Sequence, residues 1–194
     1  MGVLILDIQH AGKLTNSTDR GAGHDINGDK KIDIWEMEAE LTPRIVHFVS
    51  RQVDCRVLTY GEYSDRHKVA CEIASQNPTE KYLYIALHLN SSTTASKYYG
   101  LFGHDARSVS GKNAAVLIRN SWLNRYGDSR VVETSANHAD QYIRHMHNTI
   151  AGIYSGPSNI SGVCSEPFFI QQVGKISNLF ENYAATLVEV VRAL

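Results

Sequence analysis

Continuous apolar runs of strand length alternate along the chain with segments of helical periodicity. Residues 3–9 and 82–88 are apolar almost throughout, which is typical of strands buried on both faces of a parallel sheet. Their composition predicts the two central strands of one sheet. Shorter runs bounded by polar or turn-forming residues predict further strands at 55–60, 98–103, 130–134 and 161–165.

Helical spacing of apolar residues separates these runs and predicts helices at 34–53, 64–76, 110–126 and 175–194. Pro43 either kinks the first of them or follows Thr42 as the first residue of a later-starting helix. Residues 137–150 fit a helix or a strand, and 11–33 read as a long polar loop. The alternation predicts one α/β domain over 1–194, with a mostly parallel twisted sheet of about five to six strands and helices on both faces.

Composition narrows the possible partners. The 194 residues are 43% hydrophobic and 20% charged, with a formal net charge of −1. The chain therefore lacks the excess of basic residues that is typical of nucleic-acid-binding proteins. No apolar stretch has the length of a membrane span. Three cysteines without paired spacing favour a reducing compartment, and the N-terminus lacks the pattern of a Sec-type signal. We therefore expect a cytosolic monomer.

Potential metal ligands follow the predicted strands, at the carboxyl ends where parallel sheets usually carry their active sites. His10 and His88 each follow an apolar run, and Glu166 follows the run at 161–165. Because the carboxyl ends of parallel strands open onto one crevice, these side chains are expected to converge. Glu36 stands at the end of the long loop, with Glu38 as the next choice. Two imidazoles and one carboxylate form a catalytic zinc set, and a second carboxylate supplies the base.

A second motif overlaps this set. Residues 25–36 place oxygen ligands at positions 1, 3, 5, 9 and 12 of an EF-hand calcium loop, with Ile32 as the usual apolar residue. Lys30 replaces the glycine expected at position 6. Zinc is favoured at Glu36, because one carboxylate serves both ions poorly. The alternatives are an added calcium ion, or a non-catalytic calcium-dependent binding module, with the ligands Asp25, Asn27, Asp29 and Asp33.

Four stretches carry a family resemblance, at residues 6–12, 36–41, 87–90 and 163–170. They are similar to four segments of zinc-dependent N-acetylmuramoyl-L-alanine amidases. Residues 6–12 resemble the first strand and the turn after it, and 36–41 resemble the start of the first helix. Residues 87–90 resemble the strand that ends in a His-x-Asn motif, and 163–170 resemble the segment that contains a glutamate. The family type is amidase-3, which includes many phage endolysins. Gln9 and Ala11 replace its glycines at the first turn, and Glu40 stands where asparagine is usual. The resemblance implies that His10, Glu36 and His88 bind one zinc ion and that Glu166 is catalytic.

The same resemblance implies the substrate and the setting. The expected reaction is hydrolysis of the amide bond between N-acetylmuramic acid and L-alanine in bacterial peptidoglycan. Without a separate cell-wall-binding domain, the catalytic groove alone would hold the substrate. A phage endolysin made in the host cytoplasm and released by a holin is expected. A housekeeping amidase and a zinc peptidase that acts on the stem peptide are the enzymatic alternatives.

Overall fold

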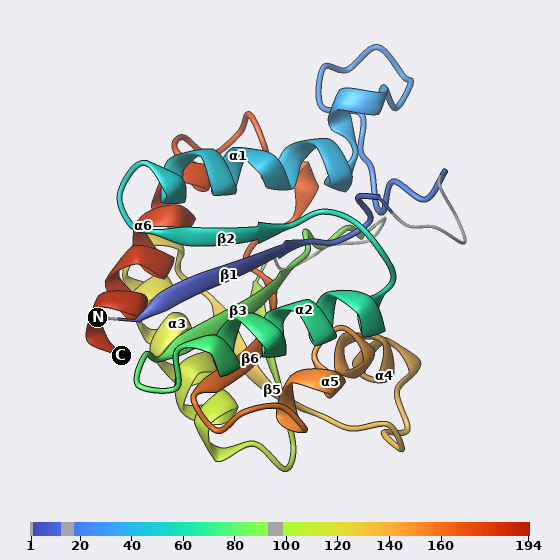
Figure 1. Ribbon diagram of the computed structural model, residues 1–194. Coiled ribbons are helices and arrows are strands. Elements are labelled where there is room, and N and C mark those ends of the chain that lie inside the picture. The colour runs from blue at the N-terminus through green and yellow to red at the C-terminus, as the bar shows by residue number, and fades with distance from the viewer. Residues whose placement is uncertain (1, 13–17, 93–98) are drawn as a thin grey trace.

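A single six-stranded sheet forms the centre of the molecule, with the strand order β2-β1-β3-β6-β4-β5 (Figure 1). The computed structural model describes residues 2–12, 18–92 and 99–194. The sheet and its strand count confirm the predicted α/β fold. The strands are β1 (Val3–Ile8), β2 (Cys55–Leu58), β3 (Tyr82–Leu87), β4 (Gly100–Asp105), β5 (Ser129–Thr134) and β6 (Ile160–Glu166).

The central strands end together at one edge of the sheet. β1 pairs in parallel with β2 and β3, and β3 pairs in parallel with β6. The register places Ile8 opposite Leu87 and Leu87 opposite Ser165, so the last residues of β1, β3 and β6 lie side by side. β4 runs antiparallel to β6, and β5 runs parallel to β4. The residues that follow β1, β3 and β6 therefore share one site.

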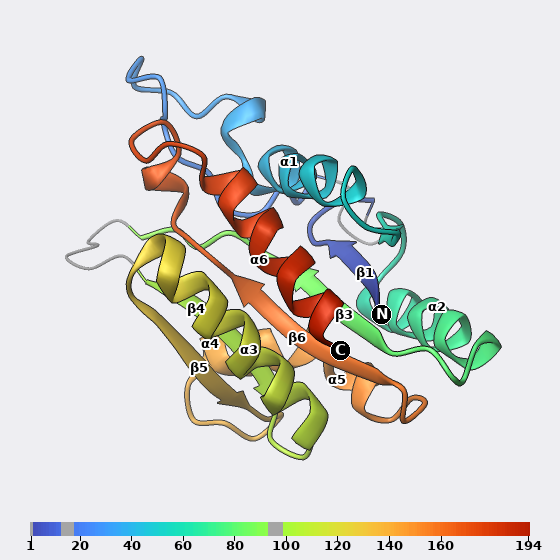
Figure 2. The same ribbon diagram turned by 90° about the vertical axis from the view of Figure 1, so that its left-hand side faces the viewer.

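Helices cover both faces of the sheet, as the sequence predicts (Figure 1). On one face α6 packs between α1 and α3, and Figure 2 shows these three helices in front of the strands. α2, α4 and α5 cover the other face. In the described part of the chain, no helix is both long and apolar enough to cross a membrane. The helices are α1 (Glu38–Ser50), α2 (Tyr63–Gln76), α3 (Val109–Tyr126), α4 (Gln141–Asn148), α5 (Ala151–Tyr154) and α6 (Leu179–Ala193), with the 3-10 helices η1 (Ile34–Glu36) and η2 (Ile170–Gln172).

The alternating side chains of the strands build one apolar core on each face. Phe102 packs beside Tyr183 of α6 and Trp122 of α3, whereas Tyr84 and Met146 belong to the core under α2 and α4. All five side chains are fully buried. Burying large apolar side chains contributes on the order of 1.5–3 kcal/mol each, so the central strands are held on both sides. This rigid sheet carries the residues at its edge.

The start of the first helix differs from the prediction. The expected helix at 34–53 is divided, because Met37 has an extended backbone (φ −93°, ψ 153°) between η1 and α1. Pro43 lies inside α1, and Thr42 does not cap the helix but donates its hydroxyl to the Glu38 carbonyl oxygen. The ambiguous segment 137–150 contains α4, and the strand predicted at 98–103 begins at Gly100, with Tyr98 outside the described residues.

Candidate active site

Three predicted residues meet at the carboxyl edge of the sheet. His10 lies two residues beyond β1, His88 directly follows β3, and Glu166 is the last residue of β6. All three line a cleft of about 350 Å³. His88 and Glu166 are each 4% exposed, so both side chains are largely shielded from solvent. The strand-end prediction for these three residues is confirmed as a placement.

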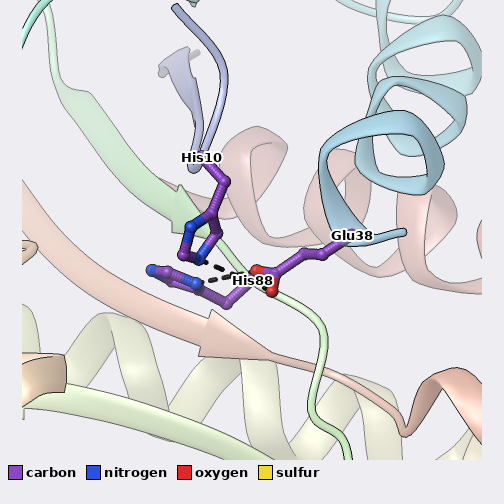
Figure 3. Close-up of side chains that lie close together, drawn as sticks. All are labelled: His10, Glu38 and His88. Carbon is purple, nitrogen blue, oxygen red and sulfur yellow. Dashed lines mark hydrogen bonds and ion pairs between the residues drawn. The ribbon is translucent and has the colours of Figure 1, made fainter. Parts of the chain in front are cut away.

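Glu38, the first residue of α1, completes the cluster. One carboxylate oxygen lies 2.8 Å from Nδ1 of His88, and the other lies 3.6 Å from Nε2 of His10 (Figure 3). The ligand atoms of the three residues all lie within 4.8 Å of one another. Glu38 is 2% exposed. The structure therefore assembles a His–Glu–His set with two buried members and the partly buried His10, in which Glu38 takes the place predicted for Glu36.

Glu36 is turned away from the histidines and into the preceding loop. Its Oε1 accepts hydrogen bonds from the backbone N–H groups of Ile26 (2.7 Å) and Asn27 (3.0 Å), and its Oε2 accepts one from Asp33 (2.8 Å). The extended Met37 separates the two glutamates and sends their side chains in different directions. The predicted grouping of Glu36 with the two histidines is therefore wrong.

The 25–36 loop has its own internal order. Asp25 accepts backbone hydrogen bonds from Gly28 and Lys30, and Asn27 accepts one from Asp29. Lys30 has a φ of 69°, the left-handed conformation that favours glycine, at the position where the calcium motif normally carries glycine. Figure 1 shows this loop, which ends in η1, projecting from the molecule beyond α1. Calcium binding here stays a prediction.

Local backbone conformation brings the segment at Gly21 close to the His–Glu–His set. His10 has a φ of 62°, which turns its ring toward Glu38 at the end of β1. Gly21 has a φ of 74°, and a Cβ atom there would lie 2.5 Å from Oε2 of Glu38 and 2.7 Å from Cδ2 of His10. Only glycine permits this approach without displacing the side chains of Glu38 and His10. The Asp19 carboxylate lies within hydrogen-bond distance of Nδ1 of His10, at 2.9 Å, and accepts from that nitrogen when it is protonated.

Opposite charges stabilise each other within the set. Burial alone would raise the pKa of Glu38, but the charge and hydrogen bond of His88, together with the charge of His10, lower it. Burial opposes protonation of His88, and the Glu38 carboxylate outweighs it and raises the pKa of that imidazole. The cluster thus favours an ionised carboxylate beside the two rings, the form that binds a cation.

These residues also fit a zinc ion on chemical grounds. Zinc binds imidazole nitrogen and carboxylate oxygen at about 2.0–2.2 Å, so donors within 4.8 Å of one another can meet one ion after small side-chain movements. Asp19 on His10 is the outer hydrogen-bond partner that ligating histidines normally have. Nε2 of His88 is buried without a hydrogen-bond partner in the described part of the chain. Such an uncompensated polar atom marks a site built for polar chemistry.

Glu166 has a different electrostatic environment from Glu38. Burial raises its pKa to about 7; the neighbouring His88 acts against this shift, and the Glu38 charge adds to it. A carboxyl group with a pKa near neutrality can take up and release a proton at physiological pH. Tyr142 donates its hydroxyl hydrogen bond to Oε2 of Glu166, and His145 lines the same cleft. Sequence reasoning missed Asp19 and Tyr142, since neither lies in a recognisable motif.

Asp7 of β1 forms an ion pair in the interior of the molecule. Its carboxylate pairs with the guanidinium of Arg66 and accepts the hydroxyl hydrogen bond of Tyr84. Arg66 also donates to the carbonyl oxygens of Ile8 and Gly61. This buried ion pair fastens α2 to the end of β1 and so supports the turn that carries His10.

The complete chain has the fold of N-acetylmuramoyl-L-alanine amidase catalytic domains. The catalytic domain of the amidase CwlV from Bacillus (Paenibacillus) polymyxa var. colistinus aligns over 100% of this chain and 97% of its own, with a TM-score of 0.61 and 15% identity. The amidase AmiC2 of Nostoc punctiforme aligns over 99% and 96%, with a TM-score of 0.59 and 13% identity. The catalytic domain of the CD27L endolysin, which targets Clostridia difficile, aligns over 100% and 98%, with a TM-score of 0.57 and 15% identity. No family model and no curated protein matches the sequence.

Proposed function

We propose that this chain is a zinc-dependent N-acetylmuramoyl-L-alanine amidase that cleaves bacterial peptidoglycan. The observation that carries the proposal is the largely buried set of His10, Glu38 and His88 beside Glu166 in one cleft, on a fold shared with amidase catalytic domains. In this proposal the first three residues hold one zinc ion. Glu166 is left outside the ligand set and acts as the base.

Each group around the cleft has a separate role in the proposed reaction. When bound, zinc supplies a Lewis acid that polarises the scissile carbonyl and lowers the pKa of water. Glu166 accepts the proton of the attacking water and delivers it to the departing nitrogen of L-alanine. Its pKa of about 7 suits both transfers, because the group is neither too weak a base nor too weak an acid. Asp19 holds the His10 ring in one orientation throughout.

The bond that is cut provides the direct test. Purified peptidoglycan is digested with the zinc-loaded protein, and its products are analysed for new end groups. We expect new L-alanine amino termini without new reducing sugars. Reducing ends would indicate a glycosidase, and amino termini of other stem-peptide residues would indicate a peptidase. Either result would overturn the proposed reaction.

Substitution of the base tests the assignment of roles. Glu166→Gln removes the proton acceptor and keeps the side-chain shape, so we expect zinc to be retained and activity to fall about 10²–10⁴-fold. Zinc content is measured by elemental analysis on the same preparation. Full activity in Glu166→Gln would show that another group is the base. A chain that carries calcium and no zinc would favour the binding-module alternative.

We also infer a lytic role for the enzyme in a phage infection. Support comes from the shared fold with the catalytic domain of an endolysin, a protein that acts on the cell wall. The test is expression in a peptidoglycan-containing host with and without a co-expressed holin. Lysis that requires the holin supports synthesis in the host cytoplasm and holin-dependent release. Lysis without it would argue against that route.

A further inference from the structure

Helix α4 forms one wall of the cleft and is firmly anchored. Asp140 caps it by accepting a hydrogen bond from the Tyr142 backbone N–H at 2.8 Å. Met146 is fully buried against the sheet, and a Cβ atom on Gly103 of β4 would lie 2.9 Å from its terminal methyl group. Tyr142 is four residues before Met146 and lies on the same side of the helix. The core and the cap therefore fix the helix that carries Tyr142.

From this anchored helix Tyr142 reaches the buried carboxylate. Its hydroxyl donates to Oε2 of Glu166, while the side chain as a whole is 39% exposed at the rim of the cleft. This hydrogen bond links the wall of the cleft directly to the proposed base. In the proposed reaction, Oε1 is the oxygen that exchanges the proton with the water and the leaving group.

We propose that Tyr142 is a positioning residue that orients the Glu166 carboxylate for its role as the base. The inference rests on the proposed function. A hydrogen bond to one oxygen restricts rotation of the carboxylate, and a donor to the charged form stabilises that form. Tyr142 acts through Glu166 and does not itself exchange a proton in the reaction.

The surroundings of Glu166 explain why such a donor is needed. Glu38 repels the negative charge and burial disfavours it, while His88 is the cation that opposes both. His145, also on α4, lies with its ring centroid 5.9 Å from that of His88. A metal ion bound by His88 and Glu38 would itself favour the ionised carboxylate, and the hydroxyl of Tyr142 adds a fixed orientation.

The test is Tyr142→Phe, which removes the hydroxyl and keeps the ring. We expect unchanged zinc content, a kcat lower by roughly 10-fold and a KM within about two-fold, since substrate binding does not need the hydroxyl. The acid limb of the rate profile should move to higher pH by up to about one unit. Tyr154→Phe, on α5 at a comparable exposure of 44%, is the matched control and should change nothing.

A second measurement does not depend on activity. In zinc-loaded protein labelled at the glutamate carboxyl carbons, NMR titration reports the ionisation of Glu166, and Tyr142→Phe should raise its pKa. Identical kcat, acid limb and titration in wild type and variant would overturn the inference. Glu166→Gln separates this from the proposed function. An inactive Glu166→Gln with an unaltered Tyr142→Phe rejects only the role of Tyr142, whereas an active Glu166→Gln rejects the base itself.

Discussion

Glu36 and Glu38 are two residues apart, both are buried, and both have lowered pKa values, but they belong to different regions of the molecule. For Glu36, burial works to raise the pKa, and three backbone N–H hydrogen bonds outweigh it. For Glu38, the opposing partners are chiefly two imidazoles from the ends of β1 and β3. Glu36 thus organises the 25–36 loop, and Glu38 joins the candidate zinc set.

The difference shows that burial and charge alone do not identify a metal ligand. The Glu36 carboxylate accepts hydrogen bonds from backbone N–H groups of the loop, and these bonds offset the cost of burying its charge. Glu38 instead faces side chains that are themselves good zinc ligands. The kind of partner, rather than the lowered pKa, therefore distinguishes the loop carboxylate from the candidate ligand.

The largest expected effect separates the two glutamates directly. Glu38→Gln should weaken zinc binding by at least 100-fold and abolish activity, because loss of an outer-shell partner alone costs about 10–100-fold. Glu36→Gln, the matched control, should keep zinc and activity within about two-fold. Elemental analysis and peptidoglycan hydrolysis are measured on both variants. Retention of zinc by Glu38→Gln together with its loss in Glu36→Gln would restore the prediction made from the sequence.

The dependence of the rate on pH sharpens the contrast further. Glu166 must be ionised to accept a proton, and its folded pKa is raised to about 7, so activity should fall as pH drops through that range. A bound cation moves the midpoint lower, and below it the rate should fall about tenfold per pH unit. Glu36→Gln should show the same acid limb as wild type. A flat kcat/KM profile down to about pH 4 would contradict the role of Glu166.

Two glycines with positive φ provide the next comparison. A Cβ atom on Gly21 would clash with both Glu38 and His10, whereas one on Gly28 of the 25–36 loop would meet nothing within 4 Å. Gly21→Ala should therefore weaken zinc binding, by roughly 10-fold on the scale of outer-shell changes. Gly28→Ala carries a similar backbone strain and should leave zinc affinity unchanged. Competition with a chromogenic chelator measures both; equal affinities would show that the segment at Gly21 does not shape the site.

The smallest expected effect concerns the loop alone. Lys30 adopts a left-handed conformation that costs a non-glycine residue roughly 1–2 kcal/mol. Lys30→Gly should raise the free energy of unfolding by about 0.5–1 kcal/mol, after the larger backbone entropy of glycine is subtracted. Chemical denaturation gives this value, and zinc affinity serves as the unaffected reference. A lower stability for Lys30→Gly would indicate that the lysine side chain stabilises the loop.

Most of the sheet and part of the site followed from local patterns. The apolar runs at 3–9 and 82–88 could only be buried in the middle of a sheet, and the polar residues at their ends had to lie at its edge. His10, His88 and Glu166 were found in this way, because strand direction determines where a strand ends. The segment that contains α4 fitted two periodicities, so Tyr142 could not be placed beside Glu166.

The sequence by itself determined the elements, the alternation that makes the fold, and three of the residues that line the cleft. Tertiary structure decided which glutamate faces the histidines. One extended residue, Met37, turns Glu36 toward the loop backbone and leaves Glu38 at the start of α1. That choice depends on how β1, β3 and α1 pack together. These elements are far apart in the chain, so residue spacing alone cannot predict their contacts.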